Sequence, residues 1–356
     1  MDSKIVILLK KISKVFTINF ILVLFFVSFT ELFFGYWFDD DNFGPYMREH
    51  RMKNQRILWK DEKEEVEYFY RRNYYGFRGR DISPSEIEGV ILGGSVIDER
   101  YKPEKYTITE FLNKKLKKNN SDIKFINGGI EAQTTAGMVS GFDNWLLKLE
   151  NFHPKYIIFY VGINDAGISE NIVLKDAYDG HMLNPNSTEV FFDNIKSRSI
   201  LLDSFRKFKF KYLPRKGFVK YDGKVSKDYI KKYNFIEYDY AIKNYDLNIL
   251  KNKYKKRIKN YITRIDRLEK YSRRLNSIPI FITNIGSNGF YELLFILNKS
   301  LINHCIKNTY NCIDLASKLN PEIDLWIDDI HTTKKGSEAI ADEIYINLEK
   351  IITKIN

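Results

Sequence analysis

Between residues 88 and 356 the chain alternates short apolar runs with longer stretches in which apolar residues recur every three or four positions. Short runs rich in β-branched and aromatic residues predict buried strands, and the longer periodic stretches predict amphipathic helices. The predicted strands are 88–94, 123–129, 155–162, 278–284 and 311–316. The predicted helices are 107–118, 134–150, 254–275, 290–308 and 333–352. This alternation predicts a central parallel sheet of about five strands between two layers of helices.

One long segment, residues 168–255, interrupts this rhythm between the third and fourth predicted strands. A connection of that length in a compact domain is usually functional or a sub-domain. Within it, residues 206–259 hold 18 Lys/Arg against 5 Asp/Glu, a balance of +13, whereas the whole chain carries +11. Such a basic, Tyr-rich stretch is compatible with a solvated helical insertion, with nucleic-acid binding, or with attraction to anionic lipid or glycan.

The amino terminus has a different pattern, an almost wholly apolar run over residues 15–38. These 24 residues would span roughly 36 Å as a helix, enough to cross a bilayer. Four lysines precede the run and acidic residues 39–41 follow it, which predicts a cytoplasmic amino terminus and an extracytoplasmic remainder. A cleaved signal peptide would have a shorter apolar region and a small-residue cleavage site. A buried helix of a soluble domain is disfavoured because this run is apolar on all sides. We therefore predict an uncleaved anchor, with the membrane contacted through residues 15–38.

The chain between the anchor and the first predicted strand is polar, charged and aromatic. We interpret residues 39–85 as a juxtamembrane stalk and residues 86–356 as the folded domain. The two cysteines, Cys305 and Cys312, lack metal-ligand spacing, so a disulfide outside the cytoplasm and a pair of buried thiols are both open. An extracytoplasmic basic segment also argues against nucleic acid as a partner.

Four polar stretches carry the candidate chemistry: "GGS" at 93–95, "NGGIEAQT" at 127–134, "GIND" at 162–165 and "DDIH" at 328–331. The first three follow predicted strands, and ligands of open parallel sheets bind at the carboxyl ends of strands. Each stretch alone is commonly a turn or a helix cap. His153 precedes a strand and is interpreted as structural.

Together and in this order, the four stretches resemble the SGNH hydrolase family, also called GDSL-type esterases, over residues 76–356 apart from the insertion. The resemblance implies a flavodoxin-like α/β/α fold, no cofactor and no metal. It implies a triad in which Ser95 is the nucleophile. His331 would be its base, and Asp328 would orient the imidazole and stabilise its cationic form.

The same resemblance assigns the donors that stabilise the oxyanion. They are the backbone N–H of Ser95, the side-chain amide of Asn164, and a backbone N–H where the family has glycine and this chain has Ala132. A backbone donor tolerates alanine there if φ is negative, and Gly129 is the alternative donor if it is not. Gly94 also departs from the family, since many relatives have Asp at that position.

Membrane-anchored, outward-facing bacterial members of this family commonly act on acylated glycans. The resemblance therefore implies an ester hydrolase that removes, or transfers, O-acetyl groups on extracytoplasmic glycan. Two other classes stay open: a lipid or thioester hydrolase at the membrane face, and a non-catalytic glycan-binding scaffold with the same fold.

Overall fold

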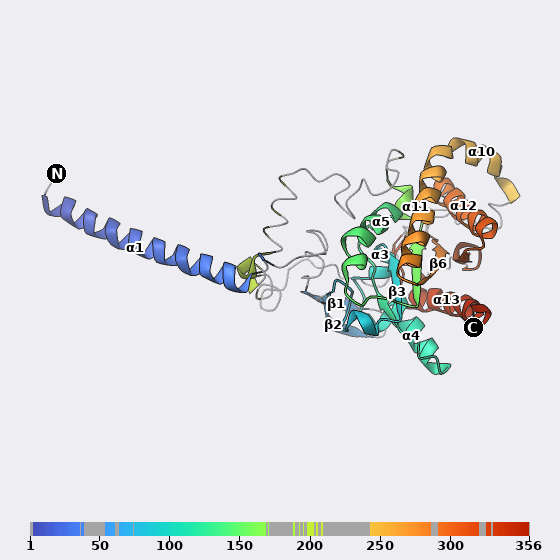
Figure 1. Ribbon diagram of the computed structural model, residues 1–356, viewed down its shortest axis with the longest axis horizontal. Coiled ribbons are helices and arrows are strands. Elements are labelled where there is room, and N and C mark those ends of the chain that lie inside the picture. Colours follow the sequence, from blue (N-terminus) through green and yellow to red (C-terminus); the bar gives the residue numbers. More distant parts are fainter. Residues whose placement is uncertain are drawn as a thin grey trace.

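The structure is a computed structural model (Figure 1). It describes residues 3–35, 37–38, 54–60, 64–73, 75–168, 170, 188, 192, 195, 198–202, 204–205, 208, 243–285, 291–319, 325–328 and 330–355.

A five-stranded parallel sheet forms the centre of the domain, as the sequence predicts. Its strands are β3 (Gly89–Gly93), β4 (Phe125–Asn127), β5 (Tyr156–Val161), β6 (Ile278–Thr283) and β7 (Asn311–Ile313). Their order is β4-β3-β5-β6-β7, and every neighbouring pair is parallel. The chain starts on β3, moves outward to β4, and then crosses back to β5. This is the flavodoxin-like order, and it has a switch point between β3 and β5, the position where such sheets bind ligands.

Helices cover both faces of the sheet (Figure 1), which confirms the predicted three-layer α/β/α fold. One face packs on α4 (Ile108–Lys118) and α13 (Lys334–Ile355). The other packs on α5 (Thr135–Asn144), α11 (Lys255–Arg274) and α12 (Glu292–Asn308). The shorter helices are α3 (Ser95–Asp98), η1 (Pro84–Glu86), η2 (Glu104–Tyr106), η3 (Leu146–Lys148), η4 (Asn164–Ala166) and η5 (Leu315–Ser317).

The central strands β3 and β5 carry no charged or amide side chain because both of their faces are covered. In β5, Ile157 and Phe159 pack toward α5 and α11, whereas Ile158 and Tyr160 pack toward α4 and α13. All four side chains are buried. A strand buried on both faces reads as a continuous apolar run rather than as an alternating pattern.

The segment interpreted as a stalk differs from the sequence prediction. Strands β1 (Asn54–Lys60) and β2 (Glu65–Arg71) form an antiparallel hairpin. Trp59 and Phe77 are buried in the domain core, so the domain begins before residue 86. The physical cause is the alternation in β2, which turns Val66, Tyr68 and Tyr70 toward the domain. Residues 39–53 lie outside the described part of the chain.

The amino-terminal apolar run forms α1 (Ser3–Phe34), which extends away from the sheet (Figure 1). Residues Lys10–Phe34 make one helix that is long and apolar enough to cross a membrane, and none of its most apolar window is buried. The helix ends earlier than the predicted span of 15–38, and it is a candidate for either a membrane span or a signal sequence.

Most of the predicted insertion at 168–255 lies outside the described residues, as does most of the basic stretch 206–259. Its last part forms α10 (Leu247–Lys253), capped by the Asp246 carboxylate, which accepts hydrogen bonds from Asn248 N and Ile249 N. Leu250 is buried in the core, so this end of the insertion is integral to the domain.

The two cysteines are joined in a disulfide, which decides between the two alternatives left by the sequence. Cys305 lies near the end of α12 and Cys312 lies in β7, with their Cα atoms 6.2 Å apart. The bond ties the fourth crossover helix to the edge strand that follows it.

Candidate active site

Strand β3 ends in a sharp turn that presents Ser95 at the carboxyl edge of the sheet. Gly94 is the N-cap of α3 and Ser95 is its first residue, where a backbone N–H has no acceptor within the helix. A side chain at Gly93 would lie 2.4 Å from Ile97 Cγ1, so glycine there lets α3 fold back closely on the strand. The hydroxyl and the free N–H of Ser95 are thus placed together.

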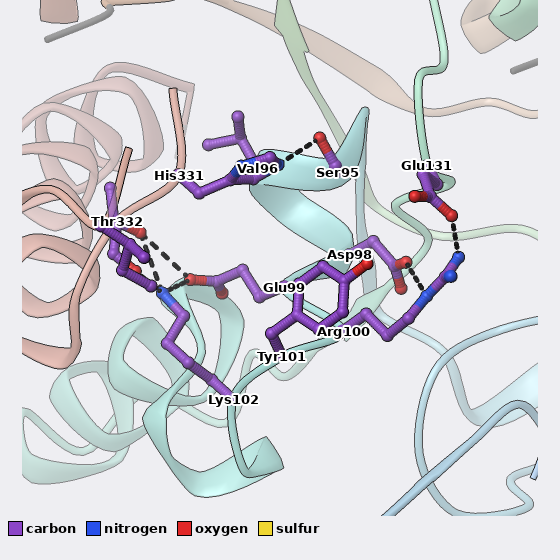
Figure 2. Close-up of a pocket in the computed structure, with 11 residues that line it drawn as sticks. Ser95, Val96, Asp98, Glu99, Arg100, Tyr101, Lys102, Glu131, His331 and Thr332 are labelled. Carbon is purple, nitrogen blue, oxygen red and sulfur yellow. Dashed lines mark hydrogen bonds and ion pairs between the residues drawn. The ribbon is translucent and has the colours of Figure 1, made fainter. Parts of the chain in front are cut away.

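The structure brings Ser95 into a hydrogen-bonded chain with His331 and Asp328. His331 Nε2 lies 2.8 Å from Ser95 Oγ, and His331 Nδ1 lies 2.7 Å from Asp328 Oδ2. Figure 2 shows the His331 side chain reaching Ser95 from the loop before α13. The contact between Ser95 and His331 joins residues 236 positions apart in the sequence. The chain of contacts has the geometry of a nucleophile, a base and a group that orients the base.

Asp328 uses its two carboxylate oxygens for different purposes. Oδ1 accepts the backbone N–H groups of Ile330 at 2.9 Å and His331 at 2.7 Å, while Oδ2 faces the imidazole. Burial alone would raise the pKa of Asp328, but these hydrogen bonds and the nearby imidazole outweigh it and lower that pKa below its usual value. The carboxylate is therefore ionised at neutral pH and can stabilise a protonated His331.

Asn164 stands at the end of the neighbouring strand β5, as its position in the sequence predicts. Its Nδ2 donates to the Gln133 carbonyl at 2.9 Å and lies beside Gly94. Gln133 directly follows Ala132, and Gly94 directly precedes Ser95. Three of the expected donor segments therefore converge on the switch point of the sheet.

Gly94 is explained by this crowding. A Cβ at position 94 would lie 2.1 Å from Asn164 Nδ2 and 3.3 Å from the Gln133 carbonyl oxygen. Glycine is therefore required here for the observed position of the Asn164 amide. Many members of the resembling family have Asp where this chain has Gly94. The absence of a side chain at Gly94 lets the Asn164 amide lie close to the backbone.

Ala132 lies in the same donor region, but it does not meet the condition of a negative φ. Its φ is +59°, in the left-handed region that favours glycine. It occupies a turn closed by Gln133 N donating to the Ile130 carbonyl at 3.0 Å. Ala132 thus keeps a glycine-like backbone conformation, and its methyl group makes that conformation strained.

This strain predicts that Ala132→Gly stabilises the protein. Removing the methyl group relieves roughly 1–2 kcal/mol of left-handed strain, partly offset by the roughly 0.5–1 kcal/mol of extra freedom of glycine in the unfolded chain. We expect a small rise in Tm with activity retained, measured by thermal unfolding. Ala136→Gly is the matched control. Ala136 lies in helix α5, where glycine is less favourable than alanine, so this substitution should lower Tm. A lower Tm for Ala132→Gly would contradict the strained conformation.

The alternative donor, Gly129, is already engaged elsewhere. Its N–H donates to Asn127 Oδ1 at 3.0 Å, and it packs so closely on α3 that a Cβ would lie 2.3 Å from Asp98 N. Since Gly129 is also buried, the structure does not leave its N–H available to a substrate.

Asp165 is a site residue that the sequence reasoning missed. It is buried and accepts hydrogen bonds from Thr135 N at 3.1 Å and Gly162 N at 3.3 Å, and it pairs with Arg264 at 3.3 Å. These contacts fix the loop that carries Asn164. The signal was present in α11, where Arg264 falls among the apolar positions Tyr261, Ile265 and Leu268.

A small cavity of about 20 Å³ opens beside Ser95 and His331 (Figure 2). Its wall includes Val96, Tyr101 and Ile327. A volume of this size is on the order of what one water molecule requires. Among the described residues, no group of three or more His, Cys, Asp or Glu side chains is placed to hold a metal ion.

Comparison with known proteins finds structural likeness only. No family model matches the chain, and no curated protein matches it. Similar solved structures include the psychrotrophic esterase EstA from Pseudoalteromonas sp. (15% identity, 75% of this chain and 99% of that chain, TM-score 0.41). They also include a putative lipolytic G-D-S-L family protein from Desulfitobacterium hafniense (12%, 73% and 99%, 0.39). A variant of an acetyl-xylooligosaccharide esterase from Geobacillus Stearmophilus is similar at 11%, 73% and 93%, with a TM-score of 0.40. At such low identity, function has to be judged from the site itself.

Proposed function

We propose that the protein is a serine esterase of the SGNH type that removes, or transfers, O-acetyl groups on extracytoplasmic glycan. The observation that supports this most strongly is the unbroken chain of hydrogen bonds from Ser95 Oγ through His331 to Asp328, at 2.8 and 2.7 Å. A serine hydroxyl is a weak nucleophile until a positioned base takes its proton, and this chain supplies that base.

In the first half of the reaction, Ser95 Oγ attacks the ester carbonyl carbon while its proton moves to His331 Nε2. Ionised Asp328 stabilises the resulting imidazolium. The negative charge on the carbonyl oxygen is met by the Ser95 N–H and the Asn164 amide, with the Ala132 N–H as the third donor. The tetrahedral intermediate then expels the sugar oxygen, which takes the proton from His331 and leaves acetyl-Ser95.

In the second half, water gives its proton to His331 and attacks the acetyl carbonyl. Collapse of that intermediate returns the proton to Ser95 Oγ and releases acetate. If a glycan hydroxyl replaces water, the same steps transfer the acetyl group instead. Both routes use the same five residues: Ser95, Ala132, Asn164, Asp328 and His331.

The size of the cavity supports a small acyl group. The cavity beside Ser95 has a volume of about 20 Å³, so a methyl group fits it better than a long alkyl chain does. We therefore expect turnover of p-nitrophenyl esters to fall steeply from acetate to butyrate and to be negligible for octanoate. Faster hydrolysis of the octanoate ester would favour a lipid or thioester hydrolase, and no hydrolysis of any ester would favour a glycan-binding scaffold.

An extracytoplasmic location is supported by the apolar helix and the disulfide. Lys10–Phe34 can cross a membrane by length and composition, and disulfides persist mainly in oxidising compartments. The lysines at the amino-terminal end of the helix favour a cytoplasmic amino terminus. The anionic surface of glycan or lipid would then attract the basic stretch 206–259.

This topology predicts the behaviour of a reporter fused after residue 356. Alkaline phosphatase, which needs disulfides, should be active there, whereas a reporter that works only in the cytoplasm should be inactive. The two reporters, each fused after residue 356 in a separate protein, are therefore expected to give opposite signals. Cytoplasmic reporter activity would contradict the location and, with it, the glycan substrate.

A further inference from the structure

A buried ion pair lies directly beside the candidate active site, between Glu99 and Lys102. Glu99 Oε1 and Lys102 Nζ are 2.5 Å apart, and their side chains are only 2% and 3% exposed. Both residues follow α3, the short helix that begins with Ser95. Burying two charges is expensive unless they are paired and fully hydrogen-bonded, so the partners of this pair identify what it stabilises.

Lys102 reaches across to the loop that carries His331 (Figure 2). Its ammonium donates to the Thr332 carbonyl at 2.7 Å and to Thr332 Oγ1 at 2.9 Å, and it also contacts Ser337 Oγ in α13. An ammonium has three donors, which suits several acceptors around one point. Thr332 is the residue directly after His331, so Lys102 anchors the backbone next to the base.

Glu99 connects the ion pair to helices α4 and α13. Its Oε2 accepts Ile108 N at the start of α4 at 2.5 Å, and its Oε1 accepts Ser337 Oγ at 2.6 Å. Glu99 also has a φ of +46°, the left-handed region that a residue with a long side chain rarely adopts. Such a conformation persists only where surrounding contacts enforce it.

The His331 loop is also held by hydrogen bonds within itself. Ile327 N donates to the His331 carbonyl at 2.8 Å, and Thr333 N donates to the Leu325 carbonyl at 2.9 Å. These bonds fix the form of the loop. The contacts from Lys102 to Thr332 fix the position of this loop relative to Ser95.

We propose that Glu99 and Lys102 are positioning residues that hold His331 at hydrogen-bond distance from Ser95. The pair acts through Thr332 and does not touch the reacting atoms. This inference rests on the proposed esterase function, because it assigns the pair a role in turnover rather than only in stability. A misplacement of about 1 Å in such a site can cost on the order of 100-fold in rate.

Lys102→Met tests the proposal, because it keeps most of the length of the side chain and removes its donors. We expect kcat for p-nitrophenyl acetate to fall about 100-fold, with KM changed less than about twofold. Labelling of Ser95 by a fluorophosphonate should slow in parallel, since that reaction also needs the base. Lys105→Met is the matched control, since Lys105 contacts Glu64 and the Tyr106 ring instead, and it should keep kcat within about twofold.

Thr332→Val is the second variant, for the case that Lys102→Met does not fold. It removes only the hydroxyl that Lys102 contacts. It should lower kcat by about 3- to 10-fold, and in the double variant it should add little to Lys102→Met, because the hydroxyl acts through the same ammonium group. Near-UV circular dichroism confirms the fold of each variant. Normal kcat in folded Lys102→Met or in Thr332→Val, or effects that multiply, would overturn the proposal. If the wild type neither hydrolyses the ester nor reacts with the fluorophosphonate, the esterase function itself is overturned, and the positioning role with it.

Discussion

Replacing Ser95 with alanine is expected to abolish ester hydrolysis, with a fall in kcat of about 10,000-fold or more. The reason is that the acetyl group must be carried by Ser95 Oγ, which lies 2.8 Å from the only side-chain base in the hydrogen-bonded chain described above. The expected readout is release of p-nitrophenol from p-nitrophenyl acetate by purified wild type and variant. The fold should be unaffected, because Ser95 is partly exposed and loses only its hydroxyl.

His331→Ala and Asp328→Ala are expected to cause similarly severe losses, Asp328→Ala the smaller of the two. The effects should not multiply when combined, since the three side chains act as one unit. Ser83→Ala is a suitable control for serine loss, because Ser83 is an exposed residue at the start of η1 whose hydroxyl contacts Ser85. Near-normal activity of His331→Ala would contradict its role as the base.

The second large effect is expected from Gly94→Ala. The added Cβ would lie 2.1 Å from Asn164 Nδ2, and the side-chain amide is the group that can move away. Loss of one oxyanion donor typically costs about 100- to 1000-fold in kcat, so Gly94→Ala should approach the loss caused by Asn164→Ala. KM should change much less, because the contact strengthens only as charge develops on the substrate.

The combination of the two substitutions provides the control for this explanation. If Gly94→Ala acts by displacing Asn164, it should have little further effect in the Asn164→Ala background. Gly94→Asp, which would match the residue common in the resembling family, should also lower activity here. Full activity of Gly94→Ala would mean that the Asn164 amide does not act from its observed position.

The central sheet could be predicted from the sequence because its strands are buried on both faces. The runs at 88–94, 155–162 and 278–284 are apolar at nearly every position, and the structure places β3, β5 and β6 within them. The polar residues that follow β3 and β5 had to lie at one edge, because parallel strands share their carboxyl ends. Ser95 and Asn164 were therefore predictable as neighbours.

The hairpin of β1 and β2 was not predicted because only one of its faces is buried. Alternating charged and aromatic residues in 65–71 were interpreted as a polar stalk, although Tyr68 and Tyr70 point toward the domain. The contacts that bury this region are long-range: Arg72 pairs with Asp98 at 2.8 Å, with both side chains fully buried. Such a pair leaves no local periodic signal.

Backbone conformation at the site could not be predicted either. The sequence indicates that Ala132 stands where the resembling family has glycine, but the sign of its φ depends on the turn closed by Ile130 and Gln133. Lys102 likewise looks like an ordinary surface lysine until the fold brings Thr332 against it, 230 residues further along the chain. The first feature depends on a local turn whose backbone conformation an alanine does not indicate, and the second depends on a tertiary contact.

Covalent labelling of Ser95 by a fluorophosphonate tests the central claim most directly. The reagent should lose fluoride and form one phosphonyl ester per chain, identified by intact mass and located on the peptide that contains Ser95. Labelling should be absent in Ser95→Ala and strongly slowed in His331→Ala. A folded wild-type protein that forms no adduct, or an adduct that persists in Ser95→Ala, would contradict the assignment of Ser95 as an activated nucleophile.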